Sequence, residues 1–449
     1  MEITDTISIV APPSPRVFRQ RLIEESTLRF SNGTWLFLVV LLGLVARLVL
    51  VGYVVGLDRE TTGDEIDYHA LASNLADGNG YRVADGHLSA RRPPLYPVAL
   101  SVLYRVFGAD PAVARLFQAV LGAVIIWLVF LVSRRLFAER VAWIAAVLTA
   151  VNPFLIFVSG YLLTENLYIV LLLMILLAVP KPTWEWRRII PAAVLLGLCT
   201  LARPTAAGVA IWIVLSALVL TRDRVSTRLI GALAVLVLVG LVVFPWGVRN
   251  HAVFGKWLFT TTHGGVTFYQ GNNAAVLEYP QYYGGVAPLY MLPGYEVLEK
   301  KPEIEKDEEA RALGKQFLRE NKRHLPILVW RKFARFWRFQ SDAGMSGVKS
   351  GWWFSKDSVL GRLASSLDVG FIYAVLAIPL FVVGLVLSLR NWSRFVLLYG
   401  LVLIHTAVTL VFHGSIRMRV PIEPVMAMFA AYALHCVVQR VRYRREPTP

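Results

Sequence analysis

The stretch TGDEIDYHALASNLADGNGYRVADGHLSARRPPLYP, residues 62–97, decides the fold, because this polar and acidic segment directly follows the first long apolar run. That run, residues 35–57, is long enough to span the hydrocarbon of a bilayer at about 1.5 Å per residue. Asp64, Glu65 and Asp67 therefore lie roughly two helical turns beyond the end of a membrane helix. We expect them at the boundary between lipid and water, where a lipid-borne substrate meets an aqueous one.

The composition is that of a polytopic membrane protein, since 56% of the 449 residues are hydrophobic and only 17% are charged. The runs at 189–202 and 206–220 are short and are separated by Arg203 and Pro204. We interpret them as two tilted helices; one broken or re-entrant helix is the alternative. The apolar runs predict an all-α bundle of about ten transmembrane helices, at residues 35–57, 111–133, 140–160, 165–180, 189–202, 206–220, 229–247, 370–389, 395–412 and 420–438.

Lysine and arginine give the chain a formal net charge of +16. We interpret this charge as a topology signal and not as nucleic-acid binding, because the basic residues gather in the tails and in short loops on one side of the bundle. That side is expected to be cytoplasmic. The loop at 58–110 and the segment at 248–368 then face the periplasm or the cell exterior, and the chain is expected in the plasma (inner) membrane. The loop residues that carry this signal are Arg134, Arg135, Arg140, Lys181, Arg187, Arg188, Arg222, Arg224, Arg228, Arg390 and Arg394.

The domain organisation follows from this topology. We expect a catalytic transmembrane region at 35–247, which includes the first outer loop, an outer and interfacial segment at 248–368, and C-terminal transmembrane helices at 369–438. Cytoplasmic tails are expected at 1–34 and 439–449. Within the outer segment, residues 306–322 have the pattern of a surface amphipathic helix, and the aromatic and basic residues of 325–339 predict a helix in the headgroup plane. The Tyr-, Gly- and Pro-rich residues 279–295 are typical of an ordered loop or lid.

Three carboxylates are candidates for catalysis. An outward-facing Asp64, with Glu65 beside it, could accept a proton from an acceptor while a phosphate leaves a sugar; the alternative is a solvated acidic loop. Glu165 lies at the outer end of a membrane helix, where a carboxylate is costly unless it is paired or functional. Its alternative is a hydrated residue at the interface that Thr164 caps.

Arginines and one histidine form a second set of candidates. Arg203, at the break before Pro204, and Arg249, at the outer end of a span, could each hold a phosphate with a guanidinium fork. Pairing with a carboxylate, or snorkelling for Arg249, would explain them without a ligand. His263 could bind a metal, although a single histidine is more often a hydrogen-bonded loop residue. Nothing in the sequence resembles a nucleotide-binding loop or a zinc-protease helix.

Several elements in order resemble the GT-C polyprenyl-phosphate-sugar glycosyltransferases, glycosyltransferase family 39, which includes protein mannosyltransferases and aminoarabinose transferase-like proteins. The resemblance covers roughly residues 35–275 and is specific only as an ensemble. The elements that carry it are Asp64-Glu65 after the first span, LASNLADGNGY, PPLYP at 93–97, Thr164-Glu165, LARPT at 201–205, FPWGVRN at 244–250, FGKW at 254–257 and QGNN at 270–273.

The resemblance implies a GT-C bundle with two outward juxtamembrane helices within about 66–105. It also implies an inverting transfer of a sugar from a polyprenyl-phosphate donor to a glycan, lipid or protein. The catalytic Asp of the family corresponds to Asp64, with Glu65 as its companion, and the second acid corresponds to Glu165, where many members have Asp. Arg203 and Arg249 match arginines that meet the lipid phosphate. A divalent metal accompanies some members, but the expected Glu-His pair reads Thr262-His263 here, so we claim no metal site and leave a divalent metal, with His263 as its candidate ligand, as an open alternative.

The pieces suggest a single mechanism. Asp64 would act as the base, Glu165 would orient it or the acceptor, and Arg203 and Arg249 would hold the phosphate. Two nearby carboxylates would be expected to raise the pKa of the base toward neutrality. The main alternative function is a lipid-linked sugar transporter or flippase, but the chain shows no inverted halves and its polar residues cluster on one face. A non-catalytic assembly partner would have no reason to keep these acids and arginines together.

Overall fold

The computed structural model describes residues 32–339 and 369–445. These residues form helices, turns and loops, and the only β-type pairing among them is an isolated antiparallel bridge between Arg82 and Leu88. The all-α prediction is therefore confirmed. Most of the predicted N-terminal tail, residues 340–368 of the outer segment and residues 446–449 of the C-terminal tail lie outside the described residues.

A helix occupies each of the ten apolar runs. Five described stretches are long and apolar enough to cross a membrane: Gly33–Tyr53, Pro111–Leu136, Val225–Phe254, Val369–Val411 and Ile416–Val441. The fourth stretch contains two of the ten helices in succession, and other predicted spans correspond to shorter helices. The helices are α2 (Asn32–Val49), α5 (Pro111–Leu136), α6 (Glu139–Ala150), α8 (Glu165–Ala178), α9 (Trp186–Ala202), α10 (Ala206–Leu220), α11 (Val225–Phe254), α18 (Val369–Ser388), α19 (Trp392–Val411) and α21 (Glu423–Arg445).

Two of the breaks between consecutive helices lie at a proline and the residue before it. The predicted span at 140–160 is two helices, because α6 ends at Ala150 and the short helix α7 (Pro153–Val158) starts anew. The side chain of Asn152 caps α7 by accepting hydrogen bonds from Phe154 N (2.9 Å) and Leu155 N (3.2 Å). Between α9 and α10, Arg203 takes the extended conformation that a residue before proline prefers. The structure thus has two helical segments at 189–220, separated at Arg203 and Pro204.

Aromatic side chains fill the core where the C-terminal helices pack on the rest of the bundle. Phe137, just after α5, stacks on Phe395 of α19 with ring centroids 4.7 Å apart, and Phe429 of α21 lies edge-on to both at 6.0 Å. Glu423, at the start of α21, accepts hydrogen bonds from Arg419 (2.8 Å) and Asn152 (2.9 Å). Helices distant in sequence are therefore fixed to one another close to the last membrane helix.

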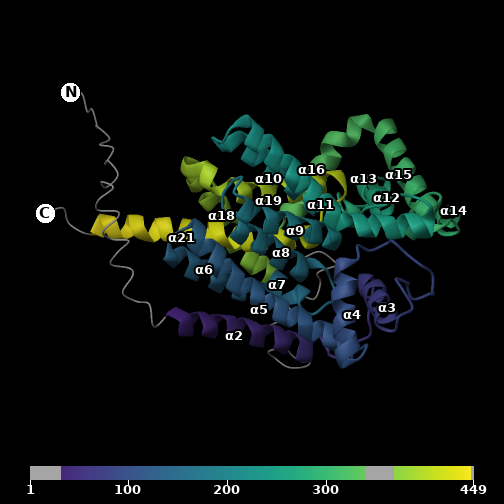
Figure 1. Cartoon of the computed structure of the whole chain (residues 1–449), viewed down its shortest axis with the longest axis horizontal. Helices are drawn as coiled ribbons and strands as arrows, with labels where there is room; N and C mark the ends of the chain where they lie inside the picture. Colours follow the sequence, from purple (N-terminus) through teal and green to yellow (C-terminus); the bar gives the residue numbers. More distant parts are fainter. Residues whose placement is uncertain (1–31, 340–368, 446–449) are drawn as a thin grey trace.

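The predicted outer elements gather at one end of the bundle. Two helices lie in the first loop, α3 (Asp64–Ala76) and α4 (Leu95–Phe107), as the resemblance implied. The predicted helices of the outer segment are α15 (Glu303–Glu320) and α16 (Leu325–Trp337). Figure 1 shows α3 and α4 at the right-hand end of the bundle, beside α12 (Gly264–Gln270) and α15. The start of α2 and the end of α21 lie at the opposite end, as an even number of spans requires.

Candidate active site

The first turn of α3 carries all three acids of the decisive stretch. Gly63 precedes the helix with φ 58° and ψ −125°, a conformation that essentially only glycine adopts, and Asp64 follows as the first helical residue. The positive end of the helix dipole favours carboxylates there. The acids then diverge: Asp64 and Asp67 lie on one face of α3, whereas Glu65 is buried in separate contacts.

Both oxygens of Asp64 accept a hydrogen bond from an arginine. Arg92, in the loop before α4, donates from Nη2 to Oδ1 at 2.6 Å, and its Nε donates to Asp67 at 2.9 Å. Arg417 lies in α20 (Ile416–Arg419), just before the last membrane helix, and donates from Nη1 to Oδ2 of Asp64 at 2.6 Å. Two guanidinium groups from distant segments therefore hold one carboxylate.

Glu165 joins the same network from the start of α8. Its side chain is fully buried, and Oε1 accepts a hydrogen bond from Nε of Arg417 at 2.6 Å. Nη1 of Arg203 lies 3.0 Å from the same oxygen, while Arg203 also lies over the ring of Tyr168. Oε2 has no hydrogen-bond partner among the described residues. The structure thus brings Asp64, Glu165 and Arg203 together, with Arg417 as the bridge.

The arginines control the protonation state of Asp64. Burial alone would raise the pKa of Asp64, but the charges of Arg417 and Arg92 outweigh it and hold the pKa well below the usual range. The expectation that a second carboxylate would raise this pKa toward neutrality is wrong, because Arg417 lies between the two acids. Asp64 is therefore a stable carboxylate and can accept a proton only when the reaction supplies a strongly acidic one or the arginines move.

Glu65 makes its contacts elsewhere. Arg59 donates to Oε2 at 2.5 Å, the backbone N–H of Thr62 donates to the same oxygen at 3.2 Å, and the N–H of Leu162 donates to Oε1 at 3.0 Å. These bonds join the start of α3 to the loop before α8. The geometry thus gives Glu65 an anchoring position and does not bring it into the network of Asp64.

Arg249 is engaged with the first outer loop. Its Nη1 donates to the carbonyl of Ser89 and to the side chain of Asn250, both at 2.8 Å, and Nη2 donates to the carbonyl of Tyr81 at 3.3 Å. The guanidinium group lies 5.0 Å over the ring of Trp246. All of these partners belong to the protein, and none of them is a member of the Asp64 network.

His263 lies near the network without joining it. Burial and the charges of Arg91 and Arg92 lower the pKa of His263 to about 3, so the ring is neutral at physiological pH. Within residues 32–339 and 369–445, no group of three His, Cys, Asp or Glu side chains is placed to hold a metal ion.

The outer segment is attached to the loop that carries Arg91 and Arg92. Glu303, the first residue of α15, accepts hydrogen bonds from Ser89 Oγ at 2.7 Å, from Ala90 N at 2.8 Å and from Thr262 Oγ1. The N–H of Thr262 donates to the carbonyl of Ala90 at 3.1 Å. A carboxylate from the part of the chain that the sequence left unexplained therefore positions the backbone next to the arginine pair.

Two glycines attach the same outer segment to the turn before Arg417. The N–H of Gly414 donates to the carbonyl of Gly284 at 2.7 Å. A Cβ on Gly414 would lie 2.4 Å from the carbonyl oxygen of Lys332, and a Cβ on Gly284 would lie 2.4 Å from the backbone of Arg331. Only glycine permits this approach, so the turn is packed directly on α16.

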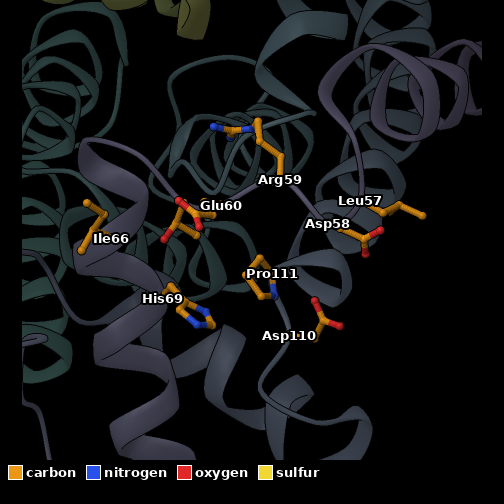
Figure 2. Close-up of a pocket in the computed structure, with 9 residues that line it drawn as sticks. Leu57, Asp58, Arg59, Glu60, Ile66, His69, Asp110 and Pro111 are labelled. Carbon is orange, nitrogen blue, oxygen red and sulfur yellow. The ribbon is translucent and has the colours of Figure 1, made fainter.

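A hollow lies on the other face of α3. Figure 2 shows Ile66 and His69 of α3 around it with Asp58, Glu60 and Asp110. His69 and Tyr104 are 2.9 Å apart, Nδ1 to the hydroxyl oxygen. Ile66 and His69 follow Asp64 by two and five residues, which places them on the opposite side of α3, so this hollow is separate from the carboxylate and arginine network.

Arg92 and Arg417 are the site residues that the sequence reasoning missed. Arg92 stands within the decisive stretch, directly before PPLYP, but no pattern there distinguished it from Arg91. Arg417 did carry a signal: in the ten-helix topology, the turn between 395–412 and 420–438 faces outward, where basic residues are disfavoured. Arg417 and Arg419 are exceptions to that rule, which indicates that they have a functional or structural role.

Comparison with known proteins agrees with this architecture. The model of the family described as dolichyl-phosphate-mannose-protein mannosyltransferase matches residues 91–248. No curated protein matches the chain. The fold is similar to that of the oligosaccharyltransferase AglB from Archaeoglobus fulgidus, solved with an inhibitory peptide and a dolichol-phosphate, at 15% identity and a TM-score of 0.51 over 93% of this chain and 52% of that one. The apo form gives 13% identity and a TM-score of 0.52, with the same two shares covered.

ArnT from Cupriavidus metallidurans, bound to undecaprenyl phosphate, is also similar, at 15% identity and a TM-score of 0.43 over 93% of this chain and 81% of that one. The chain spans about half the length of the oligosaccharyltransferase that it matches. The family match at residues 91–248, within a helical fold of this kind, confirms the resemblance seen in the sequence to the GT-C glycosyltransferases, and the apolar helices are those of an integral, multi-pass membrane protein.

Proposed function

We propose that the protein transfers a sugar, with inversion, from a polyprenyl-phosphate donor to a glycan, lipid or protein acceptor on the outer face of the plasma membrane. The observation that carries the proposal is the network in which Arg417 bridges Asp64 and Glu165, at 2.6 Å from each. Carboxylates can accept a proton and guanidinium groups can bind a phosphate, so this network holds both halves of the chemistry.

Asp64 is the base in this proposal because it alone of the two bridged acids reaches solvent. Its side chain is 32% exposed, whereas that of Glu165 is 0% exposed. The acceptor oxygen attacks the anomeric carbon as its proton moves to Asp64, and the bond from that carbon to the phosphate oxygen breaks. A single displacement of this kind inverts the anomeric centre. Glu165 positions Arg417 from the buried side of the site and does not touch the sugar.

The arginines receive the charge that develops on the leaving group. Arg203 lies 3.0 Å from Glu165, close enough to add its charge to the same region, and a guanidinium fork matches the oxygens of a phosphate. Arg249 supports the site from further away, since its donors hold the loop of Tyr81 and Ser89 in place. No step in this proposal uses a metal ion.

The position of the site supports an outward-facing reaction. The helix α3, which begins with Asp64, lies at the same end of the bundle as α4, α12 and α15, and the start of α2 and the end of α21 lie at the other (Figure 1). If the basic loops are cytoplasmic, as the positive-inside rule predicts, the network is exposed to the periplasm or exterior. A polyprenyl phosphate in the outer leaflet would then reach the arginines from the membrane while the acceptor approaches from water.

The test is transfer by the full-length protein in liposomes, with a panel of undecaprenyl-phosphate-linked hexoses and pentoses and an extract of envelope lipids and glycans as acceptors. We expect Asp64→Asn to lower the rate by about two to four orders of magnitude, since the amide cannot take the proton. Asp77→Asn, at the exposed end of the same helix, is the matched control and should transfer normally. Wild-type turnover by Asp64→Asn would show that the base is another residue.

Identification of the acceptor requires a comparison in cells. Mass spectrometry of envelope glycans, lipids and proteins, with and without the gene, should show one sugar missing from one class of molecule. The same sugar should be restored by wild-type protein and by Asp77→Asn but not by Asp64→Asn. Envelopes of identical composition, together with uptake of a lipid-linked sugar into liposomes, would support a transporter in place of a transferase.

A further inference from the structure

Arg417 has a geometry that suits a change of partner. Its Nε and Nη1 are bonded to Glu165 and Asp64, while Nη2 donates to no other residue in the described ranges. The side chain is 29% exposed, so one end of the fork is buried and the other reaches the surface of the site. It projects from α20, a helix of only four residues whose start is capped by Ser415.

Each acid keeps a second arginine if Arg417 leaves. Asp64 retains Arg92, which is bonded to Oδ1 at 2.6 Å, and Glu165 retains Arg203, at 3.0 Å from Oε1. Loss of one partner from a buried ion pair is costly mainly when it leaves an isolated charge. The alternating order of acids and arginines removes that cost, because no carboxylate is left alone.

The oxygen that Arg417 covers is the one that catalysis needs. Arg92 holds Oδ1 of Asp64 toward Asp67, inside the first loop, so Oδ2 is the oxygen that faces the rest of the site. While Arg417 donates to Oδ2, an acceptor hydroxyl competes with a guanidinium group for it. In the arrangement seen here the base is therefore masked.

Building on the proposed function, we propose that Arg417 is a ligand of the donor phosphate and that donor binding draws it away from Asp64, which frees Oδ2 to receive the proton of the acceptor. The free Nη2 meets the phosphate first, and Nη1 follows. The donor thereby activates the base, and the site does not present a free carboxylate before the donor is in place.

The charges of the reaction favour the same movement. The proton passes from the acceptor hydroxyl to Oδ2 of Asp64, the acceptor oxygen bonds to the anomeric carbon, and the electron pair of the broken bond goes to the phosphate oxygen. The phosphodiester donor thus becomes a phosphate monoester with one further negative charge, while Asp64 becomes neutral. Attraction of Arg417 to the phosphate rises as its attraction to Asp64 falls, so the exchange stabilises the transition state more than the ground state.

The exchange also restores the basicity of Asp64. Burial raises the pKa of Asp64, and the charges of Arg417 and Arg92 together lower it well below the usual range. When the phosphate takes up one of these two charges, burial opposes only Arg92, and the carboxylate becomes a stronger base.

Binding of undecaprenyl phosphate to the full-length protein in phosphatidylcholine nanodiscs tests this exchange. We expect Arg417→Ala to weaken binding by about tenfold or more, and Arg417→Lys to weaken it less, because charge is kept and the fork is lost. Asp64→Asn should tighten binding by about threefold to tenfold, since it removes the competitor for Arg417. Asp67→Asn is the matched control, because Asp67 pairs with Arg91 and Arg92 but not with Arg417. It should change binding by less than about twofold.

A double variant separates exchange from general electrostatics. If Asp64 and the phosphate compete for Arg417, Asp64→Asn should no longer tighten binding in the Arg417→Ala background. Tightening that persists there, tightening by Asp67→Asn that equals that of Asp64→Asn, or normal binding by Arg417→Ala would each overturn the exchange while the proposed function stands. Failure of the wild-type protein to bind the lipid would overturn both. If Arg417→Ala does not fold, the comparison of Asp64→Asn with Asp67→Asn, both in an Arg417→Lys background, decides the question.

Discussion

Replacement of Glu165 with glutamine would remove one negative charge from the site and little else. Oε1 accepts a hydrogen bond from Arg417 at 2.6 Å and lies 3.0 Å from Arg203, and Oε2 has no hydrogen-bond partner among the described residues. The glutamine carbonyl can therefore take the place of Oε1, and its amide nitrogen the place of Oε2, without loss of a contact. The change leaves Arg203 with no carboxylate in the network and Arg417 with Asp64 alone.

The magnitude follows from the bonds involved. A hydrogen bond to a charged group contributes about 1.5–3 kcal/mol, more than a neutral one. Because glutamine still accepts from Arg417, we expect a loss toward the lower end of that range. At about 1.4 kcal/mol for each factor of ten, turnover should fall by about tenfold to thirtyfold. This is a smaller loss than that of Asp64→Asn, because Glu165 positions Arg417 and takes no proton.

The assay is transfer from the donor that the panel identifies, with turnover and donor KM measured separately and the melting temperature measured on the same samples. Glu185→Gln, which removes an exposed glutamate whose ion-pair partner among the described residues is Arg188 at the surface, is the control. Glu165→Asp keeps the charge on a shorter side chain and should recover part of the rate. A folded Glu165→Gln protein with turnover equal to wild type would refute the positioning role, and a loss as large as that of Asp64→Asn would make Glu165 a candidate base.

Further predictions concern the groups around the network. Since the arginines hold the pKa of Asp64 well below the usual range, kcat/KM should show no acidic limb from this residue between about pH 5 and pH 8. Because the pKa of His263 is lowered to about 3, the unfolded chain binds one more proton at this residue than the folded chain between about pH 6.5 and pH 3. This histidine therefore lowers the free energy of unfolding as pH falls. Urea titrations of His263→Gln should show a smaller loss of that free energy over the same pH range. Arg249→Ala should increase hydrogen exchange in the first outer loop and raise the donor KM only slightly, because Arg249 donates to carbonyl groups of that loop. A large rise in donor KM, equal in Arg249→Ala and Arg249→Lys, would contradict that. An impermeant thiol reagent should label Asn79→Cys from outside but not Arg187→Cys, and the reverse result would invert the topology.

The helical architecture was predictable because it depends on local properties of the chain. The length of each apolar run gives each helix, and Pro204 marks where one run must break. The break at Pro153, inside the single span predicted at 140–160, was missed. Asp64, Glu165 and Arg203 could be singled out for the same reason, since polar residues at the ends of apolar runs are conspicuous in one dimension. The structure places these three together.

Pairings between distant segments were not predictable. Nothing in a single sequence relates Arg417 to Asp64, or Glu303 to Ser89, because such contacts depend on how the helices pack. The same limit explains the error in the expected pKa of Asp64: proximity of two acids was foreseen, but the guanidinium group between them was not. Arg249 looked like a phosphate ligand from its position at a helix end, and only the structure shows the carbonyl groups that occupy its donors.

The contact between Gly284 and Gly414 has a consequence for mutational studies of this chain. Neither residue has a side chain, yet their backbones meet at 2.7 Å, and the turn held there places Arg417. An alanine at 414 would push against the carbonyl of Lys332 and tilt the turn, so the arginine would miss Asp64 and Glu165 while every reactive group remained intact. A scan for loss of activity would then score Gly414 like a catalytic position, although no atom of that residue takes part in the chemistry. In this protein, loss of activity on substitution of a residue without functional groups should be interpreted as displacement of Arg417 from Asp64 and Glu165.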